Sequence, residues 1–108
     1  MLLRTPRFTD RVFTRAEREY CDTRGVAAAQ HYAARFAAKE AALKALQTGW
    51  RGGIGWQDVE VSARDTGAPF LIFRGEVLAV FEKFGATATH LSMSHTSEHA
   101  IAQVVLEC

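Results

Sequence analysis

The stretch RFAAKEAALKAL, residues 35–46, is the most informative part of this chain. Ala, Leu, Lys, Glu and Arg are strong helix formers, so the stretch predicts a helix. Its charged residues form two pairs with i,i+4 spacing, Arg35 with Lys39 and Glu40 with Lys44, and residues at that spacing are neighbours on a helix. The pairs are either solvated surface charges or parts of a site for an anionic ligand.

The predicted helix extends over about residues 27–47, with Gly49 as its C-cap. Apolar residues recur at spacings near three, four and seven, which indicates a buried stripe made of Tyr32, Phe36, Leu43 and Leu46. Before this helix, Thr14 and Glu17 have the spacing of a capping box and predict a short helix over about 15–21.

After the long helix, the hydrophobic period indicates strands and one further helix. The order helix, helix, strand, strand, helix, strand, strand is typical of an α+β fold. We therefore expect a small antiparallel sheet packed on the long helix. The predicted strands lie at about 58–63, 69–73, 89–95 and 99–106, and the helix lies at 76–84, with Val77, Val80, Phe81 and Phe84 facing inward.

The composition predicts one domain over residues 1–108. A net charge of +1 argues against a bulk nucleic-acid or membrane-surface binder, so we expect neither partner. Cys21 and Cys108 form no metal or disulfide pattern, which favours a cytoplasmic setting. We see no membrane-spanning apolar run and no signal peptide.

Two interpretations of the helix charges remain open. The first is a pair of surface ion pairs, each contributing a few tenths of a kcal/mol. The second is a phosphate and metal site, in which a carboxylate holds Mg²⁺, a lysine neutralises charge on a leaving phosphate and an arginine binds phosphate oxygens. One glutamate alone is a weak magnesium site, because Mg²⁺ needs further oxygen ligands to complete its octahedral coordination.

Four segments together resemble one family. RFAAKEAALKAL followed by Thr-Gly resembles the signature helix of holo-acyl-carrier-protein synthases, the small AcpS-type 4′-phosphopantetheinyl transferases. FTDRVFTRAEREYC at 8–21 resembles the family's preceding segment, and DVEV with TGAPFL resembles its hairpin. HLSMSHTSEHAIAQVVLE at 90–107 resembles its closing strand pair. The resemblance covers nearly the whole chain in order.

The resemblance implies a Mg²⁺-dependent transfer of phosphopantetheine from coenzyme A to a serine of an apo acyl carrier protein, with release of 3′,5′-ADP. It also implies a homotrimer with sites between subunits, and a chain this small often completes its burial by oligomerising. The implied roles are a metal ligand at Glu40, a catalytic lysine at Lys44, coenzyme A contacts at Arg35, Lys39, Thr48, Gly49 and His95, and carrier-protein docking at Arg4, Arg7 and Arg11.

The sequence departs from the family at two places. The family begins with a strand carrying Gly-x-Asp-x-x-x-x-x-Arg, whose aspartate binds the metal, and Met1 of this chain aligns after that strand. A longer native chain, a genuine relative with a compromised metal site and a degenerate relative with a new role all remain open. The second departure is Gln47, where the family usually has glycine.

Other clusters have weaker interpretations. His90, His95 and His99 lack the geometry and the cysteines of a zinc site, so a histidine metal site is disfavoured. The basic run from Arg4 to Arg18 is a solvated face, a weak RNA contact or a dock for an acidic carrier-protein helix, and Arg11, Arg15 and Arg18 are predicted to share a helix face. The alternative to an enzyme is a non-catalytic module that binds coenzyme A or the carrier protein.

Overall fold

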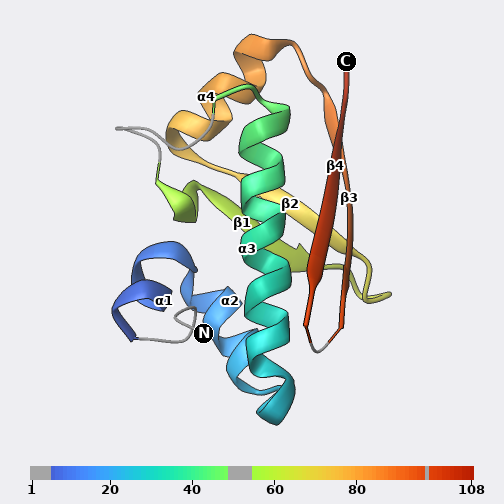
Figure 1. Ribbon diagram of the computed structural model, residues 1–108. Coiled ribbons are helices and arrows are strands. Elements are labelled where there is room, and N and C mark those ends of the chain that lie inside the picture. Colours follow the sequence, from blue (N-terminus) through green and yellow to red (C-terminus); the bar gives the residue numbers. More distant parts are fainter. Residues whose placement is uncertain (1–5, 49–54, 97) are drawn as a thin grey trace.

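A computed structural model describes residues 6–48, 55–96 and 98–108 of the chain (Figure 1). The described residues form four α-helices, four strands and two short 3₁₀ turns. The helices are α1 (Pro6–Val12), α2 (Arg15–Asp22), α3 (Ala28–Ala45) and α4 (Gly75–Phe84). The strands are β1 (Val59–Ala63), β2 (Pro69–Phe73), β3 (Ala88–His95) and β4 (Ala100–Glu107), and the 3₁₀ turns are η2 (Gly25–Ala27) and η3 (Trp56–Asp58).

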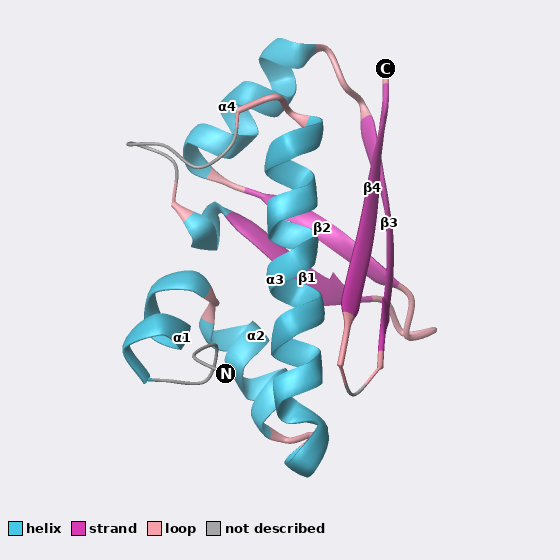
Figure 2. Cartoon of the chain, in the orientation of Figure 1, coloured by secondary structure: helices cyan, strands magenta, loops and turns pink. Residues whose placement is uncertain are grey.

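Helix α3 forms the centre of the molecule (Figure 2). The β3–β4 hairpin packs along it, α1 and α2 lie at one end, and α4 lies at the other. The strands form two separate antiparallel pairs, with Val59 opposite Phe73 in β1–β2 and Ala88 opposite Glu107 in β3–β4. The α+β class and the packing of antiparallel strands on one long helix are confirmed. Helix α1 is an addition that the sequence analysis did not predict.

The core has two parts that meet on α3. One part joins Leu43 and Leu46 to Val59 of β1 and Val77 of α4. The other surrounds Tyr32 with the first two helices and contains Val12, Phe13 and Cys21. The predicted apolar face of α4 is correct for Val77, which is fully buried, but wrong for Phe84, which is 41% exposed in the last turn.

The ends of the helices fix their positions in the chain. The predicted capping box is confirmed, because Thr14 N donates to Glu17 Oε1 at 2.8 Å and Glu17 N donates to Thr14 Oγ1 at 3.2 Å. Helix α3 ends earlier than expected. Gln47 is left-handed with φ 59°, and Thr48 N donates to Leu43 O at 3.0 Å, which closes a Schellman motif. The predicted C-cap, Gly49, lies outside the described residues.

Candidate functional site

The charged residues of α3 divide into a buried pair and an exposed pair. Arg35 is 4% exposed and Lys39 is fully buried, whereas Glu40 and Lys44 are exposed. At 3.6 residues per turn, Glu40 lies about 140° and Lys44 about 180° around the helix axis from Arg35. Arg35 and Lys39 are both cations and form no ion pair with each other, and their burial shows that they are not the solvated surface charges of the first interpretation. The two pairs face different sides of α3.

Lys39 is held in a buried ion pair that the sequence analysis did not predict. Its Nζ lies 2.8 Å from Glu17 Oε1, and both side chains are completely enclosed. The ammonium also donates to Trp56 O at 3.1 Å and to Val59 O. Glu17 Oε2 in turn accepts a hydrogen bond from Val61 N at 2.7 Å. The pair thus joins α2 and α3 to the start of β1.

This enclosure corrects the role predicted for Lys39. Burial lowers the pKa of the Lys39 ammonium, and the nearby Glu17 carboxylate opposes that change. Because the ammonium donates to Glu17 and two backbone carbonyls, it does not face a cavity where it would meet coenzyme A. Lys39 therefore joins the helices, and the coenzyme A contact expected of it does not fit this geometry.

Arg35 and His95, the two residues that the resemblance assigns to coenzyme A, line the same cavity. The cavity has a volume of about 180 Å³ and lies between α2, α3, the β1–β2 turn and β3. Arg35 Cζ stacks 4.0 Å from the centroid of the Tyr20 ring, and Arg35 Nε has no hydrogen-bond partner among the described residues. His95 Nδ1 lies 3.1 Å from Gln30 Oε1, which fixes the ring. We call this cavity the Arg35 pocket.

The Arg35 pocket also contains His31, which was not among the predicted site residues. The ring of His31 lies 4.8 Å from the ring of His95 and 5.6 Å from that of Tyr20. Burial lowers the pKa of His31, and His95, Arg35 and Arg24 lower it further. His31 is four residues before Arg35, so helical spacing was the available signal.

Glu40 and Lys44 form the exposed part of the candidate site. They share one face of α3, and neither makes an ion pair within 4 Å in the described part of the chain. Thr48 follows the end of the same helix, and Gly49 lies outside the described residues. Among the described residues, no three His, Cys, Asp or Glu side chains cluster as a metal site would require.

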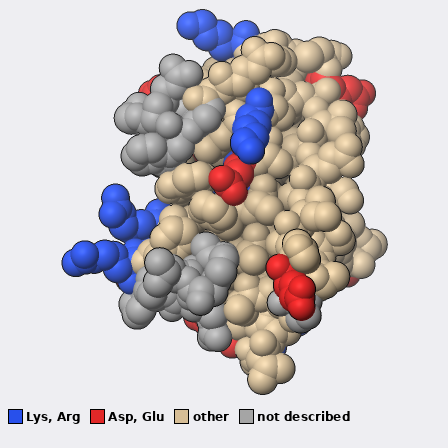
Figure 3. All heavy atoms as spheres, viewed as in Figure 1, with Lys and Arg blue, Asp and Glu red and all other residues tan. Residues whose placement is uncertain are grey.

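Basic side chains gather over α1 on the face drawn in Figure 3. Arg7 and Arg11 are exposed on this helix, and Arg4 lies outside the described residues. The single helix face predicted for Arg11, Arg15 and Arg18 is wrong, because Thr14 caps a new helix after Arg11.

Arg18 pairs with Asp10 at 2.9 Å, and Arg15 pairs with Glu19 at the same distance. Both cations of α2 are therefore engaged with carboxylates, whereas Arg7 and Arg11 of α1 have no ion pair among the described residues.

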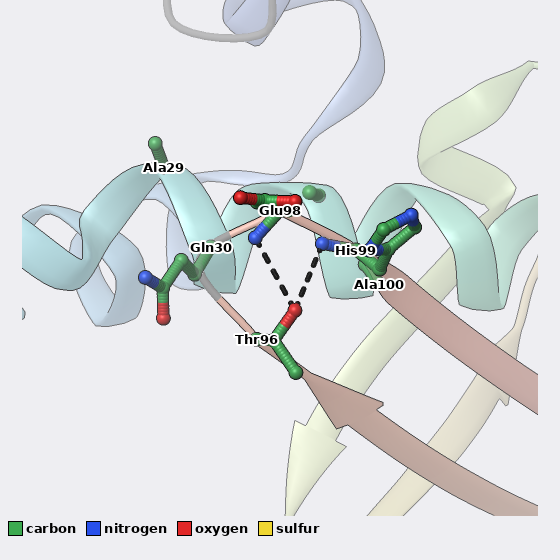
Figure 4. A pocket seen from close by; sticks show the side chains of 7 residues that line it. Ala29, Gln30, Thr96, Glu98, His99 and Ala100 are labelled. Carbon is green, nitrogen blue, oxygen red and sulfur yellow. Dashed lines mark hydrogen bonds between the residues drawn. The ribbon is translucent and has the colours of Figure 1, made fainter.

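A second cavity of about 170 Å³ lies beside the turn between β3 and β4 (Figure 4). Thr96 Oγ1 accepts hydrogen bonds from Glu98 N at 3.2 Å and His99 N at 3.1 Å, and Gln30 of α3 lines the opposite wall. These bonds hold the turn, so we interpret them as structural. None of the described helices is long and apolar enough to cross a membrane.

The fold and its side chains define a small α+β domain with a basic pocket on one side of its long helix and an exposed Glu–Lys pair on another. Residues 2–104 match the model of the 4′-phosphopantetheinyl transferase superfamily. The chain belongs to this family.

The chain is also similar to curated relatives named holo-[acyl-carrier-protein] synthase. It is 46% identical to the one from Koribacter versatilis over 94% of this chain and 80% of the relative. It is 51% identical to the one from Trichlorobacter lovleyi over 91% of this chain and 77% of the relative. A solved holo-(acyl-carrier-protein) synthase from Bacillus anthracis, in complex with coenzyme A (3′,5′-ADP), is 39% identical, with a TM-score of 0.76 over 94% of this chain and 80% of that one.

Proposed function

We propose that this chain transfers the 4′-phosphopantetheine group of coenzyme A to a serine of an apo acyl carrier protein and releases 3′,5′-ADP. The observation that carries this function is the 46–51% identity to holo-[acyl-carrier-protein] synthases over more than nine-tenths of the chain. In this reaction the serine oxygen forms a bond to the phosphorus that carries pantetheine, and the bond from that phosphorus to 3′,5′-ADP breaks. Catalysis then depends on positioning and on charge stabilisation.

The Arg35 pocket is suited to the 3′-phosphate of coenzyme A. Arg35 presents a guanidinium whose Nε has no hydrogen-bond partner in the described part of the chain, and His95 adds a ring held by Gln30. A guanidinium matches the geometry of phosphate oxygens, and enclosure strengthens its attraction for an anion. We assign Arg35 and His95 to this phosphate. Thr48 and Gly49 follow α3 and are assigned to the nucleotide.

Glu40 and Lys44 are suited to the diphosphate. Glu40 is an exposed carboxylate without a cation among the described residues, so its oxygens are available to Mg²⁺. Mg²⁺ binds through one or two carboxylates, several waters and substrate phosphates, and this donor set fits that pattern. Bound there, the ion would offset the charge of the phosphate oxygens. Lys44 lies one turn along the same face and would neutralise charge on the departing 3′,5′-ADP.

Because Arg35 and the Glu40–Lys44 pair lie on different faces of α3, the proposed site contains residues from two copies of the chain. A helix with its side chains is about 10–12 Å across, so Arg35 and Lys44 on opposite sides do not meet one ligand in one chain. A homotrimer with each site between neighbouring copies would bring one copy's Arg35 pocket to another copy's Glu40 and Lys44. Exposed apolar residues on β4, Ile101 at 65% and Val105 at 50%, are available for such an interface.

Helix α1 supplies the proposed dock for the carrier protein. Arg7 and Arg11 are exposed there, and Arg4 precedes them in the sequence. Complementary charge raises the association rate and is screened by salt, so we expect carrier-protein use to weaken as ionic strength rises. We place the enzyme in the cytoplasm, where coenzyme A is available.

The Glu40→Gln variant tests this assignment. It removes a charge at nearly constant shape, so turnover should fall at least a hundredfold while the melting temperature stays unchanged. Steady-state transfer is measured across a Mg²⁺ titration, with Glu82→Gln on α4 as the matched control, because Glu82 is also an exposed helical glutamate. Unchanged turnover and an unchanged Mg²⁺ requirement in Glu40→Gln would remove Glu40 from the site.

A further inference from the structure

His31 lines the Arg35 pocket but has no role in the reaction described so far. It is half-buried on α3, and its ring meets the ring of His95 edge to face at a centroid distance of 4.8 Å. In the described part of the chain, neither ring nitrogen of His31 has a hydrogen-bond partner. The ring is therefore available to a ligand.

The other polar groups of the pocket also favour an anion. Arg35 is 4% exposed, its Nε has no hydrogen-bond partner among the described residues, and His95 lines the same pocket. None of the described residues lining the cavity is acidic. A buried guanidinium without a carboxylate is costly to leave unpaired, so the pocket is complementary to a compact anion.

We propose that His31 binds the 3′-phosphate of coenzyme A together with Arg35 and His95, and that this contact makes the enzyme prefer coenzyme A to dephospho-coenzyme A. This inference rests on the proposed function, because it assigns a further residue to the same nucleotide site. The ligand chemistry is a phosphate monoester dianion. Inorganic phosphate shares that chemistry and is therefore one arm of the test.

The surroundings of His31 give the contact a pH dependence. The groups that face its ring are Tyr20 of α2, Arg24 before α3, Arg35 of α3 and His95 of β3. The lowered pKa keeps His31 neutral near pH 7 in the empty pocket. A phosphate dianion favours the charged imidazolium, so binding takes up a proton. Affinity should therefore fall as the pH rises above about 6, where the phosphate is already dianionic.

The inference is tested by measuring nucleotide binding, which does not depend on transfer activity. Calorimetry gives the Kd of 3′,5′-ADP and of adenosine 5′-monophosphate, which lacks the 3′-phosphate. We expect the wild-type chain to prefer 3′,5′-ADP, and His31→Ala to reduce that preference about tenfold, the size expected for one hydrogen bond to a charged group. His90→Ala is the matched control, because His90 is an exposed histidine on β3 that pairs with Glu107 outside the pocket.

A second variant separates hydrogen bonding from protonation. His31→Gln keeps a donor but cannot titrate, so it should retain most of the preference and lose the fall in affinity between about pH 6 and 8. If His31→Ala melts early, this flattened profile remains a direct readout. An unchanged ratio in His31→Ala together with an unchanged profile in His31→Gln would overturn the inference.

Two other results separate this inference from the proposed function. If wild type prefers 3′,5′-ADP and neither His31 variant alters that preference or its pH dependence, the inference fails and the proposed function stands. If wild type binds inorganic phosphate as tightly as 3′,5′-ADP, the pocket is a free-phosphate site and the assignment to coenzyme A is overturned. Binding of neither nucleotide would overturn both.

Discussion

At the residue scale, the buried pair of Glu17 and Lys39 is the contact with the largest expected effect. Removing one partner leaves the other charge enclosed, which costs about 3–5 kcal/mol in comparable buried pairs. Lys39→Met should therefore lower the free energy of unfolding by about that amount in urea titrations. Lys39 should act through folding and through the position of α3, so nucleotide binding by the remaining folded fraction should persist.

A double-mutant cycle tests whether the two charges act together. Glu17→Gln keeps an acceptor for Val61 N and removes the charge. Once Glu17 is neutral, Lys39→Met should cost at least about 1 kcal/mol less than it does in the wild-type chain. Strict additivity of the two substitutions would show that the ion pair is not coupled.

The buried thiol of Cys21 is expected to lower the free energy of unfolding at alkaline pH. Burial raises the pKa of its thiol from 9.0 to about 11, with Arg35 opposing and Glu17 adding to the change. In the unfolded chain the thiol ionises near pH 9, whereas the folded thiol stays neutral up to about pH 11. Its contribution to stability is therefore complete below pH 9 and is lost as the pH rises to about 11, by at most roughly 3 kcal/mol.

Urea unfolding between pH 8 and 11 measures this loss. Cys21→Ala should flatten the pH dependence relative to wild type, although its cavity lowers stability at every pH. Cys108→Ser is the matched control, because Cys108 is exposed. Equal slopes in wild type and Cys21→Ala would show that the thiol does not titrate as described.

The spacing of charged residues along α3 predicted some of their contacts but not others. Spacing correctly placed Arg35 beside Lys39 and Glu40 beside Lys44 on α3, but it did not say which pair is buried. The alanines of α3 make several faces of the helix apolar, so the sequence alone does not fix how the helix is rotated against its neighbours. Glu17, the partner of Lys39, lies in another helix, and contacts between elements leave no local pattern.

Among the helices and strands, the C-terminal end of α3 holds one residue in an unfavourable backbone conformation. Gln47 has φ 59°, a left-handed conformation that costs a residue with a Cβ roughly 1–2 kcal/mol. Glycine adopts it freely but loses more entropy on folding, so Gln47→Gly should raise the free energy of unfolding by about 0.5–1 kcal/mol. Thermal unfolding measures the change. Gln57→Gly in η3 is the control, and there we expect destabilisation.

The same position explains why the predicted end of α3 was late. Gly49 is the first glycine after the helix, and glycine is the usual signal of a C-cap. The chain instead closes its Schellman motif on a glutamine. By contrast, the end of α4 was predicted correctly, because Gly85 occupies the left-handed position with φ 88°. The sequence therefore predicts the end of a helix correctly when the residue with positive φ at that end is glycine.

At the scale of the whole molecule, a site shared between copies allows impaired variants to restore each other. His95→Ala weakens one part of the proposed site about tenfold and Glu40→Gln removes the other, so at coenzyme A concentrations well below saturation each variant alone should transfer at most about a tenth as fast as wild type. When the two chains are mixed and refolded together, a site with each part from a different neighbour is intact in about one case in four. We expect about a quarter of wild-type transfer, and a mixture no faster than the variants alone would place both residues in one chain's site.

Intact-mass spectrometry of an apo acyl carrier protein measures the proposed transfer reaction itself. The carrier protein is incubated with this chain, coenzyme A and Mg²⁺, and parallel samples omit each component in turn. We expect a mass increase of one phosphopantetheine in the complete sample, and none without coenzyme A or the chain. Binding of coenzyme A without any mass increase would contradict the claim and favour a non-catalytic binding module.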